Sequence, residues 1–301
     1  MSAARRGTKG PAGTVRDGGA GHRARRAAGV SAGGGRLTLV AGVALVALVV
    51  LTGLVSLVWT PYDPDAMEVT NRFALPSAAH LFGTDQYGRD ICARVMVAAR
   101  PALLVGLGSV GLGAVVGTLV GAAGAMAGGV VRAFIMRLVD GVMAFPGILL
   151  AMMLVLVVGR GLTSALIAIA LFMVPTFARL SYGLTMEARG TLWLKAAQSY
   201  GSSRMRIVTR HVLPVVLPRI VTTFTANVGA AMLLESSLSF LGLGVQPPTA
   251  SWGMMLSEAL PYVTSYPVVA VAPGVALMLA ALGFNLLGDA LNDRLVKAGV
   301  R

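Results

Sequence analysis

The chain has 301 residues, of which 56% are hydrophobic and only 12% are charged. Soluble domains carry about 25% charged residues, so this composition excludes an ordinary soluble protein and indicates an integral membrane protein. The net charge of +13 does not indicate a nucleic-acid partner, because the basic residues flank apolar segments instead of forming one soluble basic face. The single cysteine, Cys92, excludes an intrachain disulfide and a cysteine-based metal site.

Residues 1–36 are rich in glycine and arginine and contain almost no large apolar side chain. Such a segment cannot bury a core, so the sequence predicts a disordered, basic cytoplasmic tail. The apolar run that follows, from Leu37 to Trp59, is longer than the 7–15 residues of a signal-peptide core. It predicts a first transmembrane helix at residues 37–60, followed by an outer loop at residues 61–100.

Five further apolar segments reach the length of about 20 residues that a helix needs to cross a bilayer. They cover residues 102–127, 138–158, 163–183, 214–241 and 268–289. The predicted fold is therefore all-α, with six transmembrane helices and a five-helix core at residues 101–293. The glycines of the 102–127 segment are typical of closely packed membrane helices. A general bias toward glycine and alanine is the alternative explanation.

The distribution of basic residues predicts the orientation of the chain in the membrane. If the N-terminus lies inside, 20 of the 25 Lys and Arg residues fall on the inner side, including the C-terminal segment 294–301. The outer side then holds five: Arg72, Arg89, Arg94, Arg100 and Arg160. Cytoplasmic loops carry an excess of Lys and Arg, so both termini are expected in the cytoplasm.

A polar, basic stretch, KAAQSYGSSRMRIVTRHVLP, occupies residues 195–214 between the fourth and fifth apolar segments. Leu192, Ala196 and Tyr200 recur at helical spacing, and Gly201 then interrupts the helix. Pro214 can begin the next helix, because a first helical turn does not need its N–H. The stretch predicts a short amphipathic helix that either docks on a partner or lies on anionic lipid.

The same stretch resembles the EAA loop of binding-protein-dependent ABC importer permeases. The matching residues are Ala196, Ala197, Gly201, Ile207, Leu213 and Pro214. The resemblance implies that residues 184–213 form a cytoplasmic coupling loop, whose helix fits a groove on a separate ATPase subunit. Lys195 stands where the family motif has glutamate, so the contact made by that acid is altered here.

Two further stretches resemble the dipeptide, oligopeptide and nickel permeases within that family. The first is HLFGTDQYGRD at residues 80–90, although Leu81 replaces the usual proline. The second is ESSLSFLGLGVQPPTASWGMML at residues 235–256. The outer-loop motif residues carried over are Gly83, Thr84, Asp85, Gly88, Arg89 and Asp90. The pattern of glycines and polar residues there indicates turns and not a metal site.

The resemblance implies a permease subunit of the bacterial inner membrane that imports di- or oligopeptides by alternating access. Its implied partners are a second, homologous permease, two cytoplasmic ATPase subunits and an extracytoplasmic substrate-binding protein. No lysine follows glycine as in a P-loop, so no cofactor is expected in this chain and ATP is expected on the partner subunits. Nickel or another small solute is the alternative cargo, and an ATP-independent secondary transporter or a membrane enzyme is the alternative class.

Glu235 is an acid deep in the fifth apolar segment, with Ser236 and Ser239 close by. A charged side chain at the centre of a membrane helix costs about 2.5–3.5 kcal/mol on insertion scales, so it is expected to face the bundle or a water-filled path. This position is compatible with two roles for the three residues: they line the translocation pathway, or they form structural hydrogen bonds between helices.

Overall fold

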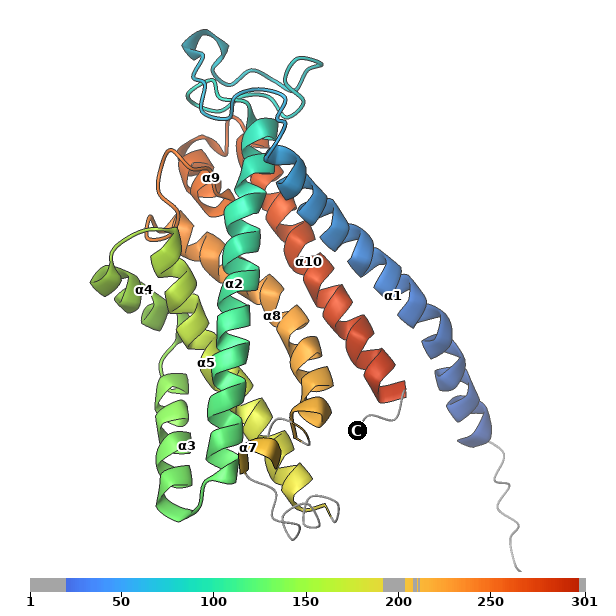
Figure 1. Cartoon of the computed structure of the whole chain (residues 1–301). Coiled ribbons are helices and arrows are strands. Elements are labelled where there is room, and N and C mark those ends of the chain that lie inside the picture. The colour runs from blue at the N-terminus through green and yellow to red at the C-terminus, as the bar shows by residue number, and fades with distance from the viewer. Residues whose placement is uncertain (1–19, 192–203, 208–209, 211, 298–301) are drawn as a thin grey trace, which may run out of the picture.

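The structure is a computed structural model that describes residues 20–191, 204–207, 210 and 212–297 (Figure 1). Within this part of the chain every regular element is a helix, and the only β-type pairing is a single bridge between Thr84 and Asp90. The helices are α1 (Ala20–Ser56), α2 (Ile91–Met126), α3 (Gly129–Met143), α4 (Gly147–Val158), α5 (Leu162–Arg189), α7 (Arg204–Ile207), α8 (Leu213–Phe240), α9 (Trp252–Ala259) and α10 (Val268–Lys297). Short 3₁₀ turns lie at Val69–Asn71 and Leu260–Tyr262.

Five of the described helices, α1, α2, α5, α8 and α10, are long and apolar enough to cross a membrane. A sixth crossing results if the bent pair α3–α4 counts as one broken span. The predicted all-α membrane fold is confirmed. The bent pair α3–α4 differs from the single span that was predicted there.

The segment predicted as one span at 138–158 is two helices that meet at an angle of 92°. The break falls at residues 144–146, where Pro146 has no N–H to donate and its ring disfavours helical geometry at the preceding Phe145. With a rise of about 1.5 Å per residue, α3 and α4 are each shorter than the hydrocarbon core of about 30 Å. The prediction of a single third helix was therefore wrong.

Several helices extend beyond the apolar runs that predicted them. α1 begins at Ala20, so residues 20–36 are helical where the sequence predicted disorder. Adding turns to an existing helix costs less than nucleating a new one, and alanine and arginine favour helix. α2 likewise begins at Ile91, inside the predicted outer loop 61–100, while α5 and α10 run on to Arg189 and Lys297.

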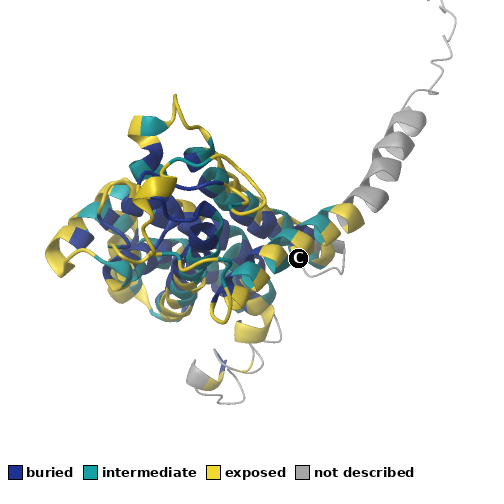
Figure 2. Cartoon of the chain, turned by 90° about the horizontal axis from the view of Figure 1, so that it is seen from above, coloured by how far each residue is buried: buried dark blue, intermediate teal, exposed yellow. Residues whose placement is uncertain are grey.

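α2 lies at the centre of the bundle and packs against α1, α5 and α8, while α10 packs between α1 and α8 (Figure 1). The buried residues concentrate in the middle of the bundle when it is viewed from above (Figure 2). Gly113, Gly117 and Gly121 face α5 so closely that a Cβ atom on Gly121 would overlap the carbonyl oxygen of Ala178. Close helix packing therefore uses these glycines.

The start of α1, the end of α10 and the short helix α7 all lie at one end of the bundle (Figure 1). The segment between α1 and α2, together with α9, lies at the opposite end. The described part of the stretch at 195–214, which includes α7, therefore lies at the opposite end of the bundle from the motif at 80–90 and from α9.

Candidate functional site

The outer-loop motif at residues 80–90 forms two tight turns ahead of α2. Gly83 and Gly88 have φ values of 73° and 77°, a region that only glycine enters without strain. A Cβ on Gly83 would collide with the carbonyl oxygen of Ala74, and a Cβ on Gly88 with that of Glu68. These glycines allow the outer segment to fold back on itself, as the sequence predicted for a turn.

Thr84 and Asp90 fix the ends of this turn region. The hydroxyl of Thr84 accepts a hydrogen bond from the Ala74 N–H at 2.8 Å and donates one to the Asn71 carbonyl. The Asp90 carboxylate accepts a bond from the Ala93 N–H at 2.7 Å and so caps the first turn of α2. Its other oxygen lies 2.9 Å from Nδ1 of His80.

A buried cluster of charges joins the outer segment to α9. The Arg89 guanidinium donates to Asp85 Oδ2 and to Glu258 Oε2, both at 2.6 Å. Burial lowers the pKa of Arg89, but the charges and hydrogen bonds of Asp85 and Glu258 outweigh burial, and the net pKa is raised. Arg94, which is fully buried, extends the cluster to Asp65 at 3.3 Å.

Sequence reasoning identified Asp85 and Arg89 but missed Glu258 and Arg94. Glu258 lies 169 residues from Arg89, and no local pattern links the two. Arg94 was placed in a loop, whereas it belongs to the first turn of α2. The cluster shows that the outer motif is a structural clamp between the start of α2 and α9.

Glu235 is fully buried in the isolated chain, near the C-terminal end of α8. Its carboxylate accepts hydrogen bonds from Ser239 at 2.6 Å and from Ser236 at 3.5 Å, both in the same helix. The Ser239 hydroxyl also accepts a bond from the Val245 N–H at 3.0 Å, which holds the chain that leaves α8. This geometry supports the structural role, and the pathway role of Glu235, Ser236 and Ser239 stays a prediction.

Replacement of Glu235 by glutamine separates these two roles. Glutamine retains an oxygen that accepts the bond from Ser239, so we expect solute uptake within about twofold of the parental protein. The measurement is uptake by cells that carry Glu235→Gln at the parental protein level. A loss of tenfold or more would show that the negative charge acts in transport.

The predicted coupling loop is only partly within the described residues. Lys195, Ala196, Ala197 and Gly201 lie outside them. Ile207, at the end of α7, is 1% exposed and contacts the core of the bundle. Leu213 begins α8 and Pro214 lies in its first turn, as the sequence predicted. Ile207 therefore anchors the segment that leads into α8.

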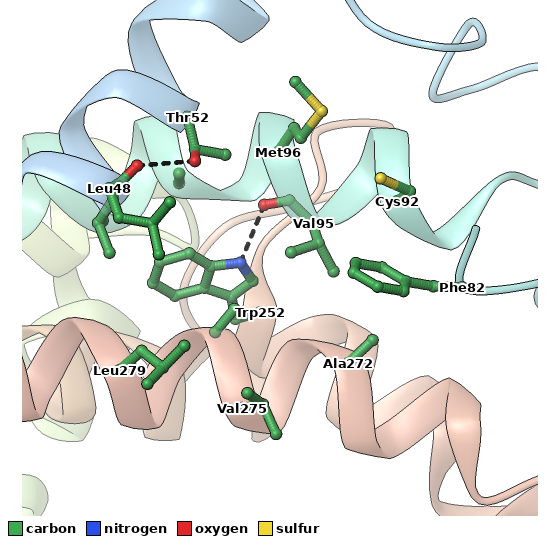
Figure 3. Close-up of a pocket in the computed structure, with 13 residues that line it drawn as sticks. Leu48, Thr52, Phe82, Cys92, Val95, Met96, Trp252, Ala272, Val275 and Leu279 are labelled. Carbon is green, nitrogen blue, oxygen red and sulfur yellow. Dashed lines mark hydrogen bonds between the residues drawn. The ribbon is translucent and has the colours of Figure 1, made fainter. Parts of the chain in front are cut away.

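A cavity of about 320 Å³ lies between α1, α2 and α10, under Trp252 of α9 (Figure 3). Its lining is almost entirely apolar and includes Leu48, Met96 and Leu279. The indole N–H of Trp252 donates to the Val95 carbonyl at 3.1 Å and fixes the ring at the cavity wall. The cavity offers no charged group for a polar solute, so it does not have the character of a peptide-binding site.

The long apolar helices and the buried charge cluster that joins the start of α2 to α9 define a polytopic membrane protein. Residues 110–298 match the family described as "Binding-protein-dependent transport system inner membrane component". The chain belongs to this family. It is a multi-pass protein of the bacterial inner membrane and the membrane component of an importer whose binding protein and ATPase are other chains. The chain itself is a transport subunit and not an enzyme.

Curated relatives agree with this assignment. The chain is 44% identical over 236 residues to the glutathione transport system permease protein GsiD of Escherichia coli O6:K15:H31, with 78% of each chain covered. The Shigella boydii protein of the same name matches equally well. The chain is 37% identical over 258 residues to the probable D,D-dipeptide transport system permease protein DdpC of Escherichia coli K12, which covers 84% of this chain and 87% of the relative.

Proposed function

We propose that this chain is a permease subunit that imports short peptides through a pathway shared with a second, homologous permease. The observation that carries the proposal is the similarity, over more than three quarters of the chain, to permeases named for glutathione and for D,D-dipeptides. Both named solutes are small peptides with charged ends. Nickel or another small solute is the alternative cargo.

The orientation with both termini in the cytoplasm is part of this proposal. The end of the bundle that carries α7 and the end of α10 also carries basic residues such as Arg189, Arg206 and Arg294. The opposite end carries the acids Asp63, Asp65 and Glu68. The excess of basic residues supports a cytoplasmic position for the α7 end, and an external position for the outer clamp beneath a docked binding protein.

The segment from Lys195 to Pro214 is proposed to receive the motion of two ATPase subunits, which bind the ATP. A helix that docks on a partner transmits force only if it is fixed to the spans that must move. The buried Ile207 and the direct entry of Leu213 and Pro214 into α8 provide such a connection. ATP binding would therefore tilt α8 and switch the pathway from inward- to outward-facing.

Replacing Gly201 with aspartate tests this coupling. We expect loss of more than 90% of peptide uptake, because the side chain would disturb the turn that the sequence predicts at Gly201 and adds an acid at the proposed docking surface. The assay offers labelled dipeptides, glutathione, a longer peptide and nickel to a strain without the gene, complemented by each variant.

Gly128→Asp is the matched control. It adds the same acid to the α2–α3 connection at the same end of the bundle, where an added Cβ meets nothing within 4 Å. We expect it to transport normally. Uptake that survives Gly201→Asp but not deletion of the gene would refute coupling through the segment from Lys195 to Pro214. If the deletion strain loses nickel uptake and no peptide uptake, the cargo is nickel and not a peptide.

A further inference from the structure

The bent pair α3–α4 is the least covered part of the bundle. Only Val139 of α3, and Ala151 and Val155 of α4, are buried. Large apolar side chains, among them Phe134 and Leu138, lie exposed on this surface. Apolar exposure alone does not distinguish lipid from protein as the covering partner, because both cover apolar side chains in a membrane.

An ion pair on this surface argues against lipid tails as its covering. Arg179 of α5 donates to Asp140 of α3 at 2.6 Å, and the two side chains are 50% and 48% exposed. About half of the surface of each side chain is therefore left uncovered by the described residues. Such a pair is stable in water or against polar protein groups, but it is unfavourable against lipid tails.

The pair lies at a depth where the neighbouring central helix is entirely uncharged. α2 carries no charged residue between Arg100 and its end at Met126. Gly121 of α2 packs against the backbone of Ala178, the residue next to Arg179. Gly121 lies five residues before the end of α2, so the pair lies about 8 Å inside that end.

α1 offers a useful contrast. Only 17% of its membrane-crossing part is buried, but the chain has no charged residue between Arg36 and Asp63. That surface suits lipid tails. The α3–α5 surface does not, because its exposed ion pair requires water or polar protein groups beside it.

We propose that Asp140 and Arg179 line the water-filled solute pathway near its inner end, on the surface that faces the second permease. This inference rests on the proposed function and adds to it the chemistry of the solute. An exposed carboxylate beside an exposed guanidinium presents both signs of charge. It suits a solute that carries an ammonium group and a carboxylate, as a peptide does.

Accessibility of an introduced cysteine tests the proposal in the assembled importer. Cys92 is first replaced by serine, and the Gly141→Cys substitution is then added. Gly141 is next to Asp140, and an added Cβ there meets nothing within 4 Å, so the ion pair is retained. The probe is a charged, membrane-impermeant maleimide, applied to both sides of membrane vesicles.

Val43→Cys in α1 is the control. Val43 is exposed on the surface assigned to lipid and lies seven residues, about 10 Å, beyond Arg36. We expect the Gly141→Cys variant to react at least tenfold faster than the Val43→Cys variant, and a transported peptide to slow its reaction. The Asp140→Cys variant, labelled in the same way, gives a second reading at the charged position itself.

Equal, slow labelling of the Gly141→Cys, Asp140→Cys and Val43→Cys variants would overturn the pathway assignment. Peptide uptake by the Cys92→Ser parent is measured in parallel and reports on the proposed function independently. If the parent imports peptide but position 141 is unreactive, only the inference about Asp140 and Arg179 fails. If the parent imports no peptide, the proposed cargo fails, while labelling still decides whether the surface faces water.

Discussion

Replacing Arg89 with methionine is expected to destabilise the folded chain by about 3–5 kcal/mol, because it leaves a buried acid without its cation. Methionine fills a similar volume, so the loss comes mainly from charge and hydrogen bonds. Asp85 would keep the backbone N–H bonds of residues 87 and 89, but its nearest cation would be Arg94, whose Nε lies 4.0 Å away. Glu258 would lose the contact that ties α9 to the start of α2.

Thermal unfolding of the purified permease complex measures this effect. Arg160→Met is the control, because Arg160 is exposed in the connection between α4 and α5, and surface changes usually stay within about 0.5 kcal/mol. Arg89→Lys keeps the charge but cannot make two forked contacts, so an intermediate loss is expected. If Arg89→Met unfolds at the same temperature as Arg160→Met, the cluster does not stabilise the fold.

The contrast between Arg89 and the membrane spans shows what could be predicted from sequence. A membrane-crossing helix satisfies its own backbone hydrogen bonds, so an uninterrupted apolar run is sufficient to predict it. The spans at α1, α2, α5, α8 and α10 were located on this basis. The start of α8 was also predicted, because Pro214 acts within one helical turn.

Long-range pairing has no such local signal. The contacts of Arg89 with Glu258, and of Arg179 with Asp140, depend on how distant helices pack. The third span was predicted as a single helix, although Pro146, which can kink a helix, marks the break in the sequence. Hydropathy averaged over about 20 residues does not register a break of three residues. The charges of Arg132 and Arg137 also lower the mean hydropathy of the first turns of α3, so these turns were left out of the predicted span.

The observed helix ends differ from the predicted ends for a related physical reason. The start of α2 is set by the capping bond that the Ala93 N–H donates to Asp90 and not by the first apolar residue of the run. Helices that protrude from the bilayer are stabilised by packing and caps, to which hydropathy is insensitive. Boundaries drawn from apolar runs therefore placed Arg94 and Arg100 in a loop, when both belong to α2.

Replacing Gly121 with valine is expected to separate α2 from α5 and to destabilise the permease by about 3 kcal/mol, at the upper end of the usual range for overpacking. The first added atom would overlap the carbonyl oxygen of Ala178, which belongs to the backbone of α5. A side chain in that position could rotate away, but a helix backbone can relieve the overlap only by moving. The loss of close contact would extend to Gly117, one turn along the same face, which also abuts the α5 backbone.

Gly111→Val supplies the matched control in the same helix. The nearest atom to an added Cβ there is in the Phe224 ring at 4.0 Å, an ordinary contact distance. Both substitutions change helix propensity equally, so the difference between them isolates the close approach of α2 and α5. We expect the amount of membrane-inserted, trypsin-resistant permease to fall at least tenfold for Gly121→Val and to change little for Gly111→Val. Equal levels for the two variants would mean that the glycines of α2 reflect composition and not packing.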